Sequence, residues 1–138
     1  MIHRRQKIKK PEIDWIKFDS WEEAEIYQYL KSWKLASFTW IDALRWVKLI
    51  TARPEPVELY AKFERWLFKI RARKYTPDFL IKKKNWVEVM LEYKSSWSEK
   101  KPDYRLRKVI FLLLHWKNIN FAELIKIKKW VYEYREYF

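Results

Sequence analysis

Two carboxylates and one amine in the middle of the chain have the types and spacing of a hydrolytic metal site. Asp78 lies in one strand-like run, and Glu92 and Lys94 lie two residues apart in the next. Because side chains alternate along a strand, Glu92 and Lys94 share one face. Carboxylates that face each other repel, and a divalent cation with hard oxygen ligands compensates that repulsion. These residue types therefore predict a bound Mg²⁺ or Mn²⁺.

A predicted hairpin brings Asp78 opposite Glu92. The polar segment 82–85 (KKKN) separates two apolar runs, and Asn85 tolerates the left-handed conformation that a tight turn requires. If the hairpin pivots near Asn85, residues equally distant from it face each other, and Asp78 then lies opposite Glu92. In this register apolar residues share one face, and the other face carries Asp78, Glu88, Met90, Glu92 and Lys94.

This stretch resembles the signature of the PD-(D/E)xK nucleases, with Pro77-Asp78 followed by Glu92-Tyr93-Lys94. In that superfamily the Asp and Glu bind magnesium, and the backbone carbonyl between Glu and Lys is usually a further ligand. The resemblance therefore implies that Asp78, Glu92 and the backbone carbonyl of Tyr93 bind the metal. It also implies that Lys94 orients the attacking water and stabilises charge at the phosphate.

Two further stretches resemble the small phage nucleases of this superfamily. The segment 18–24 (FDSWEEA) is similar to a helix that carries an upstream acidic residue, which falls on Glu23. Glu23 would then be a catalytic residue and a metal ligand, although its spacing from Ser20 also fits a capping box alone. The segment 102–111 (PDYRLRKVIF) resembles the basic helix that follows the Glu-x-Lys strand. Holliday-junction resolvases are more distant relatives by the same comparison.

The implied function is metal-dependent DNA endonuclease activity, with a preference for branched or junction DNA left open. The alternative is a viral module with the same fold that binds nucleic acid or a host protein without catalysis. Charge favours a polyanionic partner, because Lys and Arg total 31 against 18 Asp and Glu, a formal charge of +13. A Lys-rich surface that only aids solubility is the competing interpretation. Candidate DNA contacts are Arg4, Arg5, Arg71, Arg73, Lys74, Arg105 and Lys108.

Length and composition predict one domain. The chain has 138 residues, which we divide into a basic flexible arm, 1–12, and a single nuclease domain, 13–138. No apolar run is long enough to span a bilayer, and no apolar stretch of a signal peptide follows the basic start. We therefore expect no membrane partner and a cytoplasmic location, in the infected host cell if the gene is viral. The aromatic-rich surface permits a homodimer.

The predicted fold class is α/β, a central mixed sheet with an antiparallel meander flanked by helices. The resemblance implies a restriction-endonuclease-like core. Helices are expected from near Trp21, over 103–116 with Leu106, Val109, Ile110 and Leu113 toward the core, and over the tail, 128–138. Strands are expected over 57–63, 66–73, 76–82, 86–94 and 119–127, with 95–102 as a loop and 38–50 ambiguous. The chain has no glycine, so Asn, Asp or Lys should occupy turn positions with positive φ.

Overall fold

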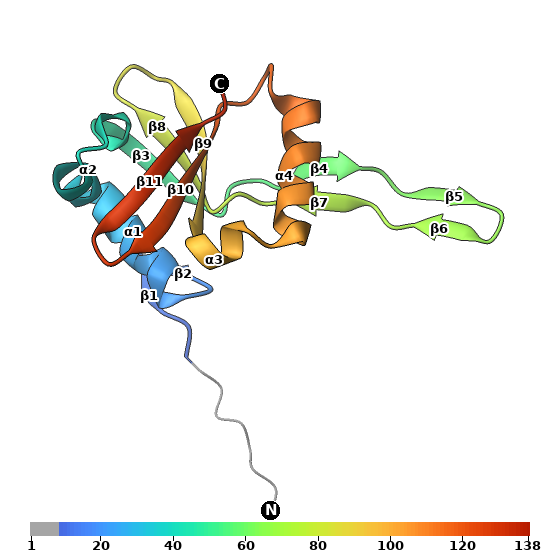
Figure 1. Ribbon diagram of the computed structural model, residues 1–138, viewed down its shortest axis with the longest axis horizontal. Coiled ribbons are helices and arrows are strands. Elements are labelled where there is room, and N and C mark those ends of the chain that lie inside the picture. Colours follow the sequence, from blue (N-terminus) through green and yellow to red (C-terminus); the bar gives the residue numbers. More distant parts are fainter. Residues whose placement is uncertain (1–8) are drawn as a thin grey trace, which may run out of the picture.

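The computed structural model describes residues 9–138 and is organised around a mixed five-stranded sheet (Figure 1). The strands are β3 (Val47–Ala52), β8 (Phe79–Lys83), β9 (Glu88–Ser95), β10 (Phe121–Lys128) and β11 (Val131–Glu136). Their order across the sheet is β11-β10-β9-β8-β3. The β9–β10 pair is parallel and the other neighbours are antiparallel. The predicted α/β class with a mixed sheet is therefore confirmed.

The hairpin β8–β9 has the register that the sequence predicts. Phe79 pairs with Leu91 and Lys82 with Glu88, so residues equally distant from Asn85 face each other. Phe79 and Leu91 are buried on one face, as alternation requires. Glu92 is also buried, but it lies on the opposite face of the sheet, which the second layer of helices, described below, covers.

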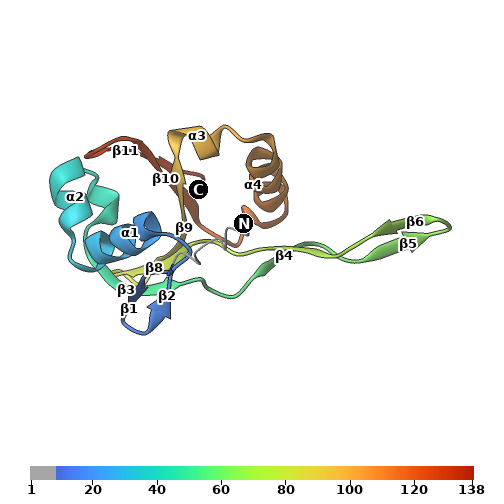
Figure 2. The same cartoon turned by 90° about the horizontal axis from the view of Figure 1, so that it is seen from below.

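The first face of the sheet is covered by α1 (Trp21–Lys31) and α2 (Lys34–Thr39), as Figure 2 shows. The side chain of Ser20 caps α1 by accepting the Glu23 N–H at 3.2 Å, which confirms the predicted helix start. Ile26 and Leu30 of α1 are buried against the sheet. A short hairpin, β1 (Glu12–Ile13) and β2 (Ile16–Lys17), precedes α1, so the first strand begins inside the range 1–12 that was predicted to be an arm.

The opposite face is covered by α3 (Ser96–Glu99) and α4 (Pro102–His115). The predicted loop 95–102 thus contains one helical turn, because Ser95 caps it by accepting the Ser98 N–H at 3.1 Å. The inward face of α4 was predicted wrongly except at Ile110, which is half-buried and packs against the small core described below. Tyr104 and Phe111 are the buried residues of the helix, whereas Leu106, Val109 and Leu113 are exposed. The helix is rotated because Phe111 packs with Tyr75 and Phe121 in a separate small core.

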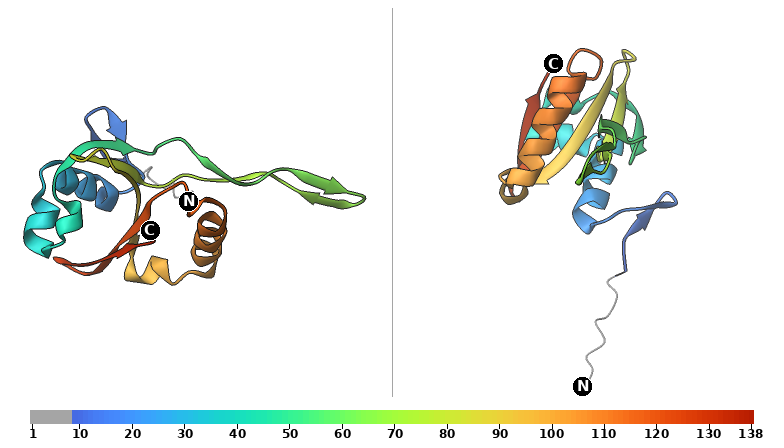
Figure 3. Two further views of the ribbon diagram at one scale, coloured as in Figure 1. Left: turned by 90° about the horizontal axis from the view of Figure 1, so that it is seen from above. Right: turned by 90° about the vertical axis from the view of Figure 1, so that its right-hand side faces the viewer.

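The predicted strands 57–63 and 66–73 do not join the sheet as a meander. They form a two-stranded ribbon, residues 57–75, which projects from the body next to α4 (Figure 3). From here on, the arm means this ribbon and not the N-terminal segment 1–12. Its strands are β4 (Val57–Tyr60), β5 (Phe63–Arg65), β6 (Phe68–Ile70) and β7 (Arg73–Tyr75), with β4 paired to β7 and β5 to β6. The sheet neighbour of β8 is instead β3, which lies in the ambiguous segment together with η1 (Asp42–Leu44).

The predicted helix in the tail is also wrong. Residues 131–136 form β11, antiparallel to β10, and Tyr132 and Tyr134 are half-buried while Val131 and Glu133 are exposed. This period of two identifies a strand on one side of a sheet. In the part of the chain that the structure describes, no helix is long and apolar enough to cross a membrane.

Turn positions with positive φ are occupied differently from the expectation. Nine described residues have φ between 50° and 68°, and seven of them are tryptophan. Asp14 and Arg53 are the other two, so Asn and Lys supply none of these conformations among residues 9–138.

Candidate functional site

Asp78 and Glu92 lie next to each other where the hairpin meets the second layer. Asp78 directly precedes β8, and its Oδ2 accepts the backbone N–H of Tyr93 at 2.8 Å. Glu92 lies in the middle of β9 and is only 4% exposed. Its carboxylate accepts the hydroxyl of Tyr75 at 2.5 Å, from the base of the arm. Two segments, 75–78 and 92–93, therefore hold the two carboxylates side by side, as the predicted hairpin register placed them.

Burial disfavours the charged form of both carboxyl groups, and the charge of Glu92 adds to this effect at Asp78. Burial raises the pKa of Asp78 to about 8, and the negative charges of Glu92 and Glu23 act in the same direction. Burial also raises the pKa of Glu92, while Lys94 and the Tyr75 hydroxyl oppose that change. A buried acidic pair with too little positive charge nearby is typical of catalytic and metal sites.

Glu23 brings a third carboxyl group to this site from the first turn of α1. It is half-buried, and desolvation, then the charge of Asp19, raise its pKa. Glu92 raises the Glu23 pKa further, which places the two side chains within electrostatic range. The backbone N–H of Glu23 is the group that Ser20 caps. Its backbone therefore takes part in helix capping while its side chain belongs to the acidic group.

Lys94 supplies the amine. Its Nζ lies 3.2 Å from a carboxylate oxygen of Glu92 and 4.8 Å from the centre of the Tyr104 ring. The amine is partly exposed, unlike Glu92. Lys94 is thus held beside the carboxylates with one side open to solvent.

The donor set fits a hard divalent cation in its chemistry. Carboxylates from Glu23, Asp78 and Glu92 offer oxygen atoms only, which suits Mg²⁺ or Mn²⁺. In residues 9–138, however, no three His, Asp or Glu side chains converge closely enough to hold an ion as they stand. Asp78 and Glu92 instead use oxygens to accept hydrogen bonds from Tyr93 and Tyr75.

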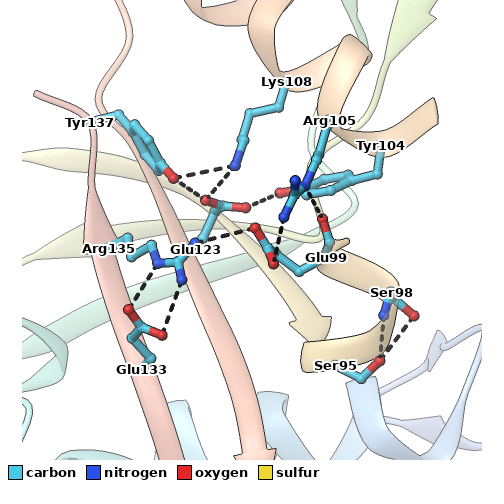
Figure 4. Close-up of polar contacts among 10 residues, drawn as sticks. All are labelled: Ser95, Ser98, Glu99, Tyr104, Arg105, Lys108, Glu123, Glu133, Arg135 and Tyr137. Carbon is cyan, nitrogen blue, oxygen red and sulfur yellow. Dashed lines mark hydrogen bonds and ion pairs between the residues drawn. The ribbon is translucent and has the colours of Figure 1, made fainter. Parts of the chain in front are cut away.

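A second buried carboxylate network lies beside the site, and Figure 4 shows its contacts. Glu123 of β10 pairs in register with Glu92 of β9 and is fully buried. It accepts hydrogen bonds from the hydroxyls of Tyr104, at 2.5 Å, and Tyr137, and its ion pair with Lys108 spans 3.0 Å. Sequence reasoning missed Glu123, although a lone acid inside the apolar run 121–125 (FAELI) was a usable signal.

Further residues of this network hold the helices to the sheet. Glu99 of α3 is buried and lies 3.2 Å from Arg135 and 3.7 Å from Arg105. Arg105 also donates a hydrogen bond from Nε to the Glu99 carbonyl at 3.3 Å. Arg105 and Lys108, predicted to bind phosphate, are thus placed in ion pairs at the edge of this network.

The other predicted DNA contacts lie mainly on the arm. Arg71 and Lys74 are exposed and form no ion pair with any residue of 9–138. Arg73 pairs with Asp103 of α4 at 3.1 Å. Arg4 and Arg5 lie outside the described residues. Arg53, which the sequence reading did not select, lies 2.6 Å from Asp19 and lowers the pKa of Glu23.

Comparison with known proteins identifies a family but no characterised relative. No curated protein and no solved structure matches this chain. A family described as "Protein of unknown function (DUF1064)" matches residues 3–132, which is nearly the whole chain. The protein therefore belongs to the DUF1064 family.

Proposed function

We propose that this protein is a metal-dependent deoxyribonuclease of the PD-(D/E)xK type with a restriction-endonuclease-like core. The observation that carries the proposal is the pair of half-buried Asp78 and buried Glu92, with Lys94 Nζ 3.2 Å from Glu92 and the pKa of Asp78 raised to about 8. A fold does not retain buried like charges for stability, since each carboxylate loses hydration and repels the other. A ligand that is positively charged accounts for their presence.

Asp78, Glu92, Glu23 and the backbone carbonyl of Tyr93 would hold the metal. A bound Mg²⁺ or Mn²⁺ would supply Lewis-acid activation of the scissile phosphate. Lys94 donates hydrogen bonds at the phosphate and offsets the negative charge that develops there. Tyr75 restrains one oxygen of Glu92 by its 2.5 Å hydrogen bond, which limits the orientations of that carboxylate. Basic residues on the arm hold the DNA backbone by its phosphates.

Cleavage of supercoiled plasmid with and without Mg²⁺ tests the proposal. The parental protein should nick or linearise the plasmid with Mg²⁺ or Mn²⁺, and excess EDTA should abolish this activity. DNA binding should survive in EDTA, because the phosphate contacts lie outside the acidic group. Full activity in EDTA would contradict the metal mechanism.

A non-catalytic module that binds nucleic acid is the competing function, favoured by the formal charge of +13, which attracts polyanions whether or not the acidic group is catalytic. It predicts salt-sensitive DNA binding with no cleavage under any divalent cation. A panel of linear, nicked, single-stranded and four-way-junction DNA with Mg²⁺ and Mn²⁺ separates the two functions.

A further inference from the structure

The arm is the most exposed part of the protein. All residues from Tyr60 to Lys69 are exposed, and only the base of the arm contacts the body, where Leu59 and Tyr75 pack with Phe111. A strand rises about 3.3 Å per residue, so the run from Val57 to the turn at Trp66 extends roughly 30 Å. Figures 2 and 3 show the ribbon projecting past α4. An isolated two-stranded ribbon is marginally stable in water, which indicates a partner.

The side chains of the arm combine positive charge with an apolar tip. Segment 57–75 contains six Lys or Arg residues and two Glu residues. The carboxylate of Glu64 forms ion pairs with two amines, at 3.6 Å from Lys62 Nζ and 4.0 Å from Lys69 Nζ. Arg65, Arg71 and Lys74 form no ion pair within residues 9–138. At the tip, Leu67 is fully exposed and the neighbouring Phe68 is 61% exposed.

We propose that the arm is a DNA-binding ribbon whose tip, Leu67 and Phe68, wedges against a base step while Arg65, Arg71 and Lys74 contact phosphates. A two-stranded ribbon fits a DNA groove, and exposed apolar side chains inserted between bases unstack them locally. Charge complementarity selects a polyanion over a protein surface. This inference rests on the proposed nuclease function, to which it adds how the substrate is held.

Fluorescence of 2-aminopurine in duplex DNA, measured in EDTA so that nothing is cut, tests the wedge. The parental protein should raise the fluorescence, because a wedged step loses stacking. The double variant Leu67→Ser/Phe68→Ser should abolish the rise and weaken binding about tenfold or more. Leu113→Ser, an exposed leucine on α4, is the matched control and should change neither signal.

The salt dependence of DNA binding tests the basic residues of the arm. Neutralising Arg65, Arg71 and Lys74 to Gln should flatten the salt dependence of binding by a slope of about 0.9 per lost phosphate contact. Parental binding and fluorescence in both arm variants would overturn the inference. The inference would also be overturned if an arm variant lost self-association of the protein but bound DNA with the parental affinity. Failure of the nuclease function is distinguishable, since it appears as absent cleavage by the parental protein.

A separate observation concerns the tryptophans. Seven of the nine described residues with positive φ are tryptophan, a conformation in which the Cβ of any bulky residue is crowded. All ten tryptophans are exposed, from 39% at Trp33 to 95% at Trp15, although tryptophan is normally well buried. Average usage predicts about ten glycines in a chain of this length, and this chain has none.

The positions themselves are those of glycine turns. Trp15 follows Asp14 in a two-residue hairpin turn in which both residues have positive φ, the conformation that favours Asp-Gly. Trp86 follows Asn85 at the end of the β8–β9 loop, where a left-handed glycine closes the turn. Trp40 ends α2 in the left-handed conformation, with its N–H bonded to the Ala36 carbonyl at 3.1 Å, as a C-terminal glycine does.

We infer that the natural chain carries glycine at the ten tryptophan positions of the printed sequence. One codon accounts for this, because UGA is read as tryptophan in some genetic codes and as glycine in others. The exposed indoles then carry no argument for base stacking. The apolar tip of the arm is unaffected, since it consists of Leu67 and Phe68.

The codons of the gene and the mass of its natural product test the inference. All ten positions should be UGA, and tryptic peptides of the natural protein should have the mass of glycine there. UGG codons, or peptides with the mass of tryptophan, would overturn it. As a structural check, replacing the seven positive-φ tryptophans by glycine should raise Tm, whereas Trp97→Gly, in the helix α3, should not. An unchanged or lower Tm in the seven-residue variant would contradict the backbone argument.

Discussion

At the scale of single residues, the proposed function predicts separable roles for the two carboxylates, Asp78 and Glu92, and for the neighbouring amine of Lys94. Asp78→Asn and Glu92→Gln should lower cleavage at least about a thousandfold, because each removes a charged metal ligand while keeping its size. Lys94→Ala should reduce cleavage as strongly but leave metal binding largely intact, because an ammonium is not a ligand. Gel-based cleavage rates, together with isothermal titration of Mn²⁺, measure the two effects.

Circular dichroism must show that these variants are folded, since Asp78 and Glu92 adjoin central strands. Glu88→Gln is a suitable control, because Glu88 lies in the same strand, exposed, 3.8 Å from Lys82. If folded Asp78→Asn and Glu92→Gln cut DNA at the parental rate, the hairpin is not the active site.

The raised pKa of Asp78 predicts a pH-dependent stability in the absence of metal. Its pKa rises from the ordinary 3.8 to about 8, so the folded state binds the proton more tightly than the unfolded state. The resulting stabilisation is complete below about pH 4 and is lost as the pH rises through about 8. Between pH 5 and 8 the parental chain should lose at least about 1 kcal/mol relative to Asp78→Asn, or about 3 °C in Tm.

Thermal denaturation of both proteins in EDTA at several pH values measures this difference. Mg²⁺ should reverse the loss at pH 8, because it binds the ionised carboxylates. Parallel pH profiles for the two proteins would show that Asp78 titrates normally.

The residues of the site were predictable because their constraints are local. The hairpin register follows from alternation about Asn85, and it places Asp78 beside Glu92 without any tertiary information. The partners Tyr75 and Glu123 come from elements distant in sequence. No local pattern specifies such contacts, so the sequence could indicate only that Glu123 is unusual.

At the scale of elements, the packing of α4 on the sheet depends on its polar network. The pattern of α4 predicted a core-facing side of Leu106, Val109, Ile110 and Leu113. Of these only Ile110 packs inward, and the buried residues are Tyr104 and Phe111. Polar groups explain the difference, because Tyr104 and Lys108 both reach Glu123. Hydrophobicity alone is a poor guide to a helix that buries a carboxylate.

Glu123→Ala should therefore destabilise the fold by about 3 to 5 kcal/mol. It leaves the buried amine of Lys108 without its partner and two tyrosine hydroxyls without an acceptor. Urea denaturation measures the free energy of unfolding. In the double variant Glu123→Leu/Lys108→Met the loss should be smaller than the sum of the single effects, since no buried charge remains. Additive losses would show that the two side chains are not coupled.

The arm and the tail were misread for different reasons. The arm was predicted as strands, but the partner of a strand is set by tertiary contacts. The tail was predicted as a helix, although its exposure pattern has the period of two that is typical of a strand. Residues 57–75 pair with each other rather than with β8, and the tail extends the sheet next to β10. A local reading identifies a strand more readily than it identifies the neighbour.

At the scale of the whole molecule, net charge is the property that the sequence determines directly. A formal charge of +13 is independent of the fold, and the fold decides only where the charges gather. Lys108 and Arg105 are drawn into ion pairs with Glu123 and Glu99, whereas Arg71 and Lys74 remain exposed on the arm. The acidic group of Glu23, Asp78 and Glu92 contributes negative potential, which would repel phosphate in the absence of a bound cation.

This division of charge predicts how binding responds to salt and to metal. Between low and moderate salt, affinity for duplex DNA should fall steeply, because each phosphate contact releases a counterion and contributes about 0.9 to the logarithmic slope. Asp78→Asn/Glu92→Gln should bind more tightly than the parental protein in EDTA, since two negative charges near the phosphates are removed. Addition of Ca²⁺ should bring the parental affinity close to that of the variant. Fluorescence anisotropy across a salt series measures all three quantities. An affinity that is independent of salt would remove nucleic acid as the partner, whereas a steep slope with no difference between the two proteins would place the DNA away from the acidic site.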